Sequence, residues 1–168
     1  MKKILLLFSA ILLFSCGARK TSNGIPGKKT LKGTWTVSDI DFYGNEGTYK
    51  AKMFNYADSP CFKNSDWMFI PNNGSGKFTT AASNSQCEVS TTRIHWSYFD
   101  TDTDRYIQFK YVDDKNRKLD PENRGYRIKI KSLTETTMVA DVDVTSNGNP
   151  FTVSLTFNKT SDNVKLYN

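Results

Sequence analysis

The last third of the chain is dominated by runs in which apolar and polar residues alternate with a period of two. These runs cover residues 126–131, 138–145 and 151–158. Because successive side chains of a β-strand point to opposite faces, each run predicts a strand with one buried and one solvated face. This pattern is typical of antiparallel sheets that pack one face on a core.

Shorter strand-like runs, separated by turn-forming residues, precede these three along the chain. They cover residues 35–42, 48–56, 67–70, 77–80, 87–99 and 105–112. No stretch shows sustained helical spacing, so we expect one all-β domain over residues 31–168. About eight strands in up-and-down order would suit a closed antiparallel β-barrel, and a sandwich of two sheets fits the same pattern nearly as well.

The N-terminus has the features of an export signal. Lys2 and Lys3 precede an apolar run over residues 4–14, which is too short to span a bilayer. Leu13 lies three residues before Cys16, and a small serine directly precedes the cysteine. This arrangement resembles the bacterial lipobox, which implies cleavage before Cys16 and acylation of the new N-terminal cysteine. Several acyl chains would anchor the protein stably, since one chain alone binds a membrane only marginally.

The lipobox resemblance divides the chain into three parts. Residues 1–15 form the expected lipoprotein signal peptide, residues 16–30 the lipidated cysteine with a flexible tether, and residues 31–168 the folded domain. Residues 17–20 contain neither an aspartate nor an acidic cluster. In lipoproteins of this class such a start implies the inner leaflet of the outer membrane, with the domain facing the periplasm.

The charge of the chain argues against nucleic acid as a partner. The formal net charge is only +6, and the basic pairs at 28–29 and 117–118 are isolated from each other. There is no basic stripe with interleaved aromatic residues. We therefore expect contact with a membrane through the lipid anchor, and the sequence identifies no protein partner.

The folded domain resembles the lipocalin-like proteins at three points. Leu31-Lys32-Gly33-Thr34-Trp35 resembles the G-x-W signature at the first strand of that family. Cys61, followed by Trp67-Met68-Phe69 and a glycine-rich turn at 74–76, resembles bacterial lipocalin-like lipoproteins, and residues 132–138 resemble their turn between two late strands. The resemblance favours the eight-stranded barrel and implies that Gly33 and Trp35 close one of its ends.

The chain also departs from the longer lipocalins. It lacks their T-D-Y-like turn, and it ends at Asn168 without room for the C-terminal helix that follows their barrel. Lys159 is the nearest candidate for the arginine that stacks on their first tryptophan. The resemblance therefore assigns the broad lipocalin-like class and no specific ligand.

With Cys16 expected to carry lipid, two cysteines remain, Cys61 and Cys87. Two cysteines in an exported chain predict a disulfide. A bridge that closes a loop of about 26 residues would stabilise the fold by roughly 3–4 kcal/mol through loop-closure entropy. The alternative, a redox or metal-binding pair, lacks a C-x-x-C motif and further ligands.

No set of residues predicts catalysis, a metal site or a cofactor. His95, the single histidine, lies opposite the apolar face of its predicted strand, which favours a solvated side chain over a general base. Asp100-Thr101-Asp102-Thr103-Asp104 resembles the start of a calcium loop, but Arg105 and Tyr111 occupy the positions of the required glycine and glutamate. A hairpin turn with solvated carboxylates is the simpler interpretation, and we expect a protein that is not an enzyme.

Six aromatic side chains on predicted inward faces leave two functions open. They are Trp96, Tyr98, Phe109, Tyr111, Tyr126 and Phe157. If they line a cavity, the protein binds a small hydrophobic ligand inside its barrel. If they fill the interior, the long loops at 57–66 and 112–125 carry the function, for example as an envelope interaction protein that inhibits a protease or a lysozyme.

Lipidation is testable through Cys16. Cells fed a labelled fatty acid should incorporate the label, and Cys16→Ala should abolish it, because the acylated residue is gone. Ser15→Ala keeps a small residue before the cysteine, serves as the matched control and should retain the label. Label that persists in Cys16→Ala would contradict the lipobox assignment.

Overall fold

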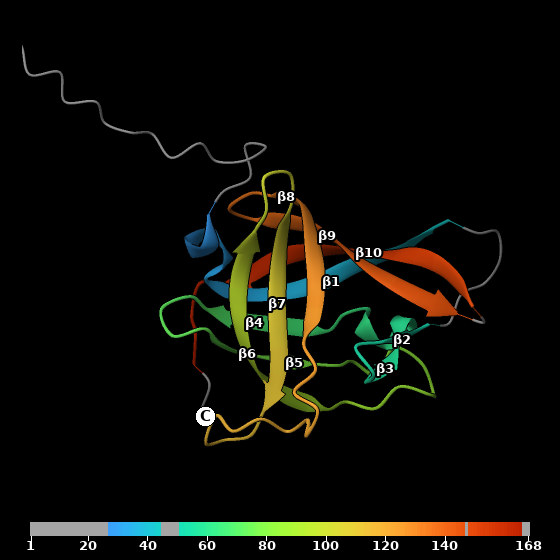
Figure 1. The fold of residues 1–168 in the computed structure, drawn as a ribbon, viewed down its shortest axis with the longest axis horizontal. Helices are drawn as coiled ribbons and strands as arrows, with labels where there is room; N and C mark the ends of the chain where they lie inside the picture. The colour runs from blue at the N-terminus through green and yellow to red at the C-terminus, as the bar shows by residue number, and fades with distance from the viewer. Residues whose placement is uncertain (1–26, 45–50, 147, 166–168) are drawn as a thin grey trace, which may run out of the picture.

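The structure is a computed structural model that describes residues 27–44, 51–146 and 148–165. Its principal strands are β1 (Gly33–Tyr43), β4 (Asp66–Ile70), β5 (Ser75–Thr79), β6 (Thr91–Asp100), β7 (Arg105–Val112), β8 (Tyr126–Leu133), β9 (Thr137–Ser146) and β10 (Asn149–Ser161). Consecutive principal strands pair antiparallel, and β1 pairs with both β4 and β10. The eight strands therefore close into the predicted up-and-down barrel, which excludes the two-sheet sandwich (Figure 1).

Within the described residues, four short elements lie outside the barrel wall. They are η2 (Lys28–Leu31), β2 (Lys52–Met53), β3 (Ala57–Asp58) and η3 (Ser59–Phe62), where η marks a 3-10 helix. β2 and β3 form a small ribbon in the long connection from β1 to β4. Neither η2 nor η3, the helices of the described ranges, has the length and apolar character needed to cross a membrane. η2 begins at Lys28, so it includes residues that the sequence placed in the tether.

The two ends of the barrel differ in their connections. Short turns at 71–74, 101–104 and 134–136 join strands at one end, which we call the closed end. The connection from β1 to β4 and the loops at 80–90 and 113–125 join strands at the other end, which we call the open end. Function is therefore expected at the open end, because long loops on a rigid scaffold commonly carry it.

Trp35 seals the closed end from inside. Its side chain is fully buried, and its Nε1 donates a hydrogen bond of 2.9 Å to the carbonyl oxygen of Leu31 in η2. The Nζ of Lys159 lies 5.2 Å from the centroid of the indole ring. A lysine thus makes the cation–π contact for which the family resemblance implies an arginine.

Gly33 has a steric reason to be glycine. Its φ is +128°, a left-handed region that side chains disfavour, and a Cβ there would lie 2.4 Å from the carbonyl oxygen of Ser161. The absent side chain lets β1 approach the end of β10 closely. This approach positions Trp35, two residues later, over the closed end.

The predicted strand over residues 48–56 is wrong for its described part. Only Lys52–Met53 is strand, and Phe54 and Asn55 have φ values of 55° and 51°, which turn the chain back toward β3. Left-handed backbone costs about 1–2 kcal/mol per residue. Burying a phenylalanine in a core stabilises by about 3–5 kcal/mol relative to alanine, so the burial of Phe54 outweighs the local preference.

The strand predicted over residues 87–99 begins later, at Thr91. Residues before it are held by other contacts, since Cys87 forms a disulfide and Thr80 Oγ1 donates to the carbonyl oxygen of Glu88 at 2.7 Å. These contacts hold the backbone of 87–90 outside the barrel ladder. The strand then continues one residue beyond its predicted end, to Asp100.

Gly33→Ala should lower the free energy of unfolding by about 2–3 kcal/mol, because the methyl group adds a backbone collision to a left-handed φ. Urea denaturation measures the loss. Gly148→Ala is the control, since Gly148 has a φ of +80° but nothing within 4 Å of an added Cβ. Equal losses in the two variants would contradict the role assigned to close packing at Ser161.

Candidate functional site

Aromatic side chains packed around Trp67 fill the interior of the barrel. The Trp67 ring is fully buried, and its centroid lies 4.6–6.3 Å from those of six phenylalanine rings. These belong to Phe54, Phe62, Phe69, Phe78, Phe109 and Phe157. Trp67 Nε1 donates to Ser65 Oγ at 3.0 Å, which satisfies the one polar atom of the indole. Interlocking rings of this kind make a filled barrel.

The β2–β3 ribbon closes the open end with two aromatic side chains. We call residues 51–58 the plug. The ring of Phe54 lies 5.1 Å from that of Phe109 and 5.9 Å from that of Tyr126, and the ring of Tyr56 lies 5.0 Å from that of Phe78. Phe54 is only 6 % exposed, so the plug occupies the space through which a ligand would enter the barrel.

Hydrogen bonds from the barrel wall hold the plug. Tyr111 donates its hydroxyl proton to the carbonyl oxygen of Phe54 at 2.8 Å, and Thr92 Oγ1 donates to the hydroxyl oxygen of Tyr56 at 2.9 Å. Burial raises the pKa of Tyr111 far above its ordinary value, so its hydroxyl stays protonated and remains a donor. The left-handed backbone of Phe54 is therefore fixed both by its ring and by its carbonyl group.

The six predicted inward-facing aromatic residues all lie in the core or against it. Trp96, Phe109 and Phe157 are buried, whereas Tyr98, Tyr111 and Tyr126 pack on the core and are partly exposed. Within the described ranges they do not surround one cavity. Trp96 packs on Phe69 near the β4–β5 turn, and its Nε1 donates to Ser75 at 2.8 Å, whereas Tyr126 lies beside the plug.

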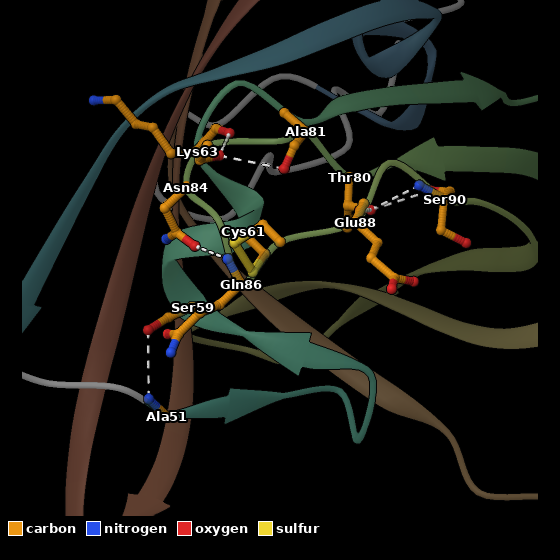
Figure 2. The surroundings of a disulfide bond; sticks show 12 residues. Ala51, Ser59, Cys61, Lys63, Thr80, Ala81, Asn84, Gln86, Glu88 and Ser90 are labelled. Atoms are coloured by element: carbon orange, nitrogen blue, oxygen red, sulfur yellow. Dashed lines mark hydrogen bonds between the residues drawn. A yellow bond between two sulfur atoms is a disulfide. The ribbon is translucent and has the colours of Figure 1, made fainter.

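The predicted disulfide between Cys61 and Cys87 is confirmed. Figure 2 shows the bridge next to η3, where Cys61 lies, with Ser59 and Ala51 close by. The backbone N–H of Ala51, the first residue of the plug, donates to Ser59 Oγ at 3.4 Å. The bridge therefore ties the base of the plug to the loop between β5 and β6. Cys16, the predicted lipidation site, lies outside the described residues.

A cleft of about 870 Å³ opens at the open end where β8 and β9 separate. Pairing between the two strands extends only as far as Lys129 and Asp141, and beyond that point β9 runs out with β10 while β8 continues along β7. Figure 1 shows this divergence, with the ends of β9 and β10 projecting from the barrel and the plug below them. Phe54 and Tyr126 form its aromatic floor. We call it the β8/β9 cleft.

The rim of the β8/β9 cleft is charged. It carries Lys52, Lys110, Arg127, Lys129, Asp141 and Asp143. Lys110 Nζ donates to the amide oxygen of Asn123 at 2.9 Å, and Arg127 Nε donates to that of Gln108 at 3.1 Å. Both of these partners are neutral amides, and Arg127 also lies 5.0 Å from the centroid of the Phe99 ring. Lys129, in contrast, forms an ion pair with Asp104 at 2.9 Å.

The turn at 101–104 is a hairpin turn, as the simpler interpretation predicts. The backbone N–H of Thr101 donates to the carbonyl oxygen of Asp104 at 2.8 Å. The Asp104 carboxylate accepts a hydrogen bond from Lys129, which holds the pKa of Asp104 below its ordinary value. His95 is exposed on β6. Among the residues that the structure describes, no three His, Cys, Asp or Glu side chains gather as a metal site would require.

Two features of the site are absent from the sequence predictions. The residues around Phe54 have the sequence pattern of a weak strand. Asn55, which tolerates left-handed backbone, is the one local sign of a turn there. No local sequence pattern predicts the separation of β8 from β9. It depends on tertiary pairing, since β8 stays paired with β7 and β9 stays paired with β10. The predicted loop at 57–66 is in turn largely structured, since it contains β3 and η3.

Comparison with known proteins gives matches of structure alone. No protein-family model matches the chain, and no curated protein matches it. Bovine odorant-binding protein in complex with a selenium-containing odorant is similar at 16 % identity and a TM-score of 0.43, over 83 % of this chain and 75 % of that one. The same bovine protein with its natural ligand is 17 % identical, with coverages of 82 % and 74 % and a TM-score of 0.43. Its structure from nasal mucosa is 17 % identical, with coverages of 83 % and 76 % and the same score.

Phe54→Ala should lower the free energy of unfolding by about 3–5 kcal/mol, because it removes a ring that touches Trp67, Phe109 and Tyr126. Urea denaturation measures this loss. The control is Val89→Ala, since Val89 is 67 % exposed and its truncation should change stability by less than about 0.5 kcal/mol. A loss below about 1 kcal/mol for Phe54→Ala would show that the plug is not part of the core.

Proposed function

We propose that this chain is a bacterial lipoprotein, anchored through Cys16 to the outer membrane and facing the periplasm, which binds a protein partner at the open end of its barrel. The anchor rests on the resemblance of Leu13 to Cys16 to a lipobox. The plug is the observation that supports binding on the outside of the barrel, because Phe54 and Tyr56 fill its mouth. A filled barrel leaves its outer surface and its loops to make specific contacts.

Exposed apolar side chains at the open end support contact with a protein. Tyr43, Val89 and Leu119 are 57 %, 67 % and 57 % exposed, and each lies in or next to a different open-end connection. Phe99, the other large exposed apolar side chain of the described ranges, lies near the closed end. The centres of protein–protein interfaces are apolar, so these three side chains offer contact points for a partner at the open end.

The loop at 113–125 is organised before any partner binds. Asp113 Oδ1 accepts the backbone N–H of Arg117 at 2.7 Å, and Asp120 Oδ1 accepts that of Glu122 at 2.9 Å. The backbone hydrogen bond from Arg117 keeps the pKa of Asp113 below its ordinary value, so this carboxylate stays ionised and holds its turn. A loop ordered in this way loses less conformational entropy on binding, which favours affinity.

A small hydrophobic ligand inside the barrel is the second candidate. It would have to displace Phe54 from its ring contacts, at a cost of about 3–5 kcal/mol. That cost weakens the affinity by more than about 100-fold relative to an open barrel. Catalysis is not part of the proposed function, because the observations that support the proposal concern the filled barrel and its outer surface.

Site-directed photocrosslinking tests the partner. A photoreactive phenylalanine analogue placed at Val89 or Leu119 should crosslink the protein in intact cells to one discrete band. The same analogue at Asn72, in an exposed turn at the closed end, is the matched control and should give no such band. Crosslinks that are absent from both open-end positions would contradict a protein partner.

Native mass spectrometry of protein purified gently from its own envelope separates the two candidates. The filled barrel predicts the mass of the lipidated chain without an additional small molecule. An additional mass that disappears on denaturation would identify a bound ligand and would favour the second candidate.

A further inference from the structure

We propose that the barrel lies on its side against a membrane surface of anionic lipid, with the outer face of β5, β6, β7 and β8 toward the headgroups. The inference rests on the lipid anchor of the proposed function and adds the orientation of the domain that the anchor holds. It follows from three observations: opposite charges on the two halves of the barrel wall, a groove with a basic lining, and the place where the chain enters the barrel.

Charged side chains on the outside of the barrel are separated by sign. The strand order divides the closed barrel into two contiguous halves, and one of them consists of β5, β6, β7 and β8. Figure 1 shows β6, β7 and β8 side by side across one side of the barrel. Apart from Asp100 at the end of β6, the charged side chains on the outer face of this half are all basic, and we call this face the basic wall. They are Lys77, Arg93, Lys110, Arg127, Lys129 and Lys131.

The other half, formed by β9, β10, β1 and β4, carries aspartates on its outer face, which we call the acidic wall. They are Asp39, Asp41, Asp66, Asp141 and Asp143. The one basic residue of these four strands, Lys159, places its Nζ over the Trp35 ring and pairs with Asp162 at 3.0 Å. Opposite charges on two sides of the barrel give it a dipole across its axis. Such a dipole turns the basic wall toward an anionic surface.

Ion pairs at the borders of the basic wall reduce its charge without cancelling it. The pairs are Lys129 with Asp104, Lys131 with Asp141, and Arg105 with Asp100. Arg93 shares a surface pocket with Asp113 and Asp114, which offset its charge. Among the described residues, Lys77, Lys110 and Arg127 form no ion pair. Residues 75–133, with every connection included, carry 11 basic and eight acidic residues, so the region keeps a positive net charge.

A groove on the outer side of β6 and β7 provides a place for a headgroup. It has a volume of about 420 Å³, and its polar lining includes His95, Ser97, Lys110, Asn116 and Lys118. No acidic residue of the described ranges lines it. A lipid phosphate in this groove would accept charge-assisted hydrogen bonds from the two ammonium groups, which favours an anionic headgroup over a neutral one.

The chain enters the barrel at the closed end, next to the basic wall. The Nζ of Lys28 in η2 lies 5.0 Å from the centroid of the Trp96 ring on β6. Residues 16–26, which precede the first described residue, span at most about 40 Å, since an extended chain rises by no more than about 3.6 Å per residue. An anchor at Cys16 therefore keeps the closed end within this distance of the headgroups. At such a distance a weak attraction acts within one tethered unit and gains from a high effective concentration.

The composition of the basic wall favours a lipid surface over a second copy of this chain. Two barrels that paired through opposite walls would touch along convex surfaces. On the basic wall, within the described residues, Phe99 is the one large apolar side chain that is more than a third exposed. Protein–protein interfaces have apolar centres, whereas basic side chains bind anionic headgroups without one.

Vesicle binding by the chain from residue 16 with Cys16→Ala tests the attraction without the lipid anchor. This chain keeps the whole barrel, because every described element lies between Lys28 and Ser161. It should sediment with vesicles of equal parts phosphatidylglycerol and phosphatidylcholine at about 20 mM salt, and about 500 mM salt should release it by screening. It should not sediment with vesicles of phosphatidylcholine alone. Equal binding to both kinds of vesicle, or binding to neither, would overturn the proposal.

Charge removal on the two walls tests which side binds. Lys77→Gln with Lys110→Gln should weaken binding to the anionic vesicles about 20-fold or more, since each basic side chain near anionic lipid contributes about fivefold. Asp41→Asn with Asp143→Asn, added to that variant, restores its net charge from the acidic wall and should leave binding weak. Recovery of binding in the fourfold variant would show that net charge alone acts, which would overturn the orientation.

Paramagnetic relaxation in NMR spectra measures the orientation itself, with a gadolinium chelate on a lipid headgroup of the anionic vesicles. The amide signals of Lys77, His95 and Lys110 should broaden more than those of Asp41 and Asp143. Equal broadening of the two sets, or stronger broadening on the acidic wall, would contradict the assigned side. Salt-sensitive self-association in the absence of vesicles would show that the two walls pair with each other, and would overturn the lipid surface as the occupant.

The outcomes also separate this inference from the function on which it rests. If vesicle binding fails while Cys16→Ala abolishes the fatty-acid label, the anchor stands and the orientation falls alone. If the label persists in Cys16→Ala, the proposed anchor falls, and vesicle binding would then support the basic wall by itself.

Discussion

The packing of aromatic rings around Trp67 is the interaction on which the rest of the structure depends. Six phenylalanine side chains from the barrel wall, η3 and the plug meet this indole, and its one polar atom is satisfied by Ser65. Each such ring pair contributes about 0.5–1.5 kcal/mol in addition to the free energy gained from the apolar area that it buries. That gain offsets the left-handed backbone at Phe54 and holds a loop segment inside the barrel. The barrel is thus completed by its own connection from β1 to β4.

Filling the interior moves the binding surface to the outside. The plug closes the mouth of the barrel, the disulfide at Cys61 fixes its base, and β9 separates from β8 near the plug. The β8/β9 cleft is therefore a consequence of the same packing, because the plug supplies the aromatic floor between two strands that no longer pair. The long loops, the separated edges of β8 and β9, and the exposed side chains of Tyr43, Val89 and Leu119 then lie at the open end.

The sequence predicts the features whose physics is local. Alternation over residues 126–158 predicts three strands because strand faces repeat every second residue. The resemblance at Gly33 and Trp35 marks one end of the barrel, where the structure leaves room only for glycine at position 33. Phe54 is missed because its conformation is decided by tertiary burial against a local preference. The six aromatic residues are correctly placed facing inward, yet the pattern of one strand cannot tell whether another segment fills the space between them. Residues 1–26, which carry the lipobox, lie outside the described residues, so the anchor stays a prediction.

Titration of the chain from residue 16, carrying Cys16→Ala, with a lipophilic fluorophore such as 1-aminoanthracene tests the filled barrel most directly. A filled barrel should give no saturable rise in fluorescence with this chain. A saturable rise should appear once Phe54→Ala is added, because loss of the ring opens an apolar cavity beside Trp67. Saturable binding of one fluorophore per chain with Phe54 in place would contradict the claim that the plug fills the barrel.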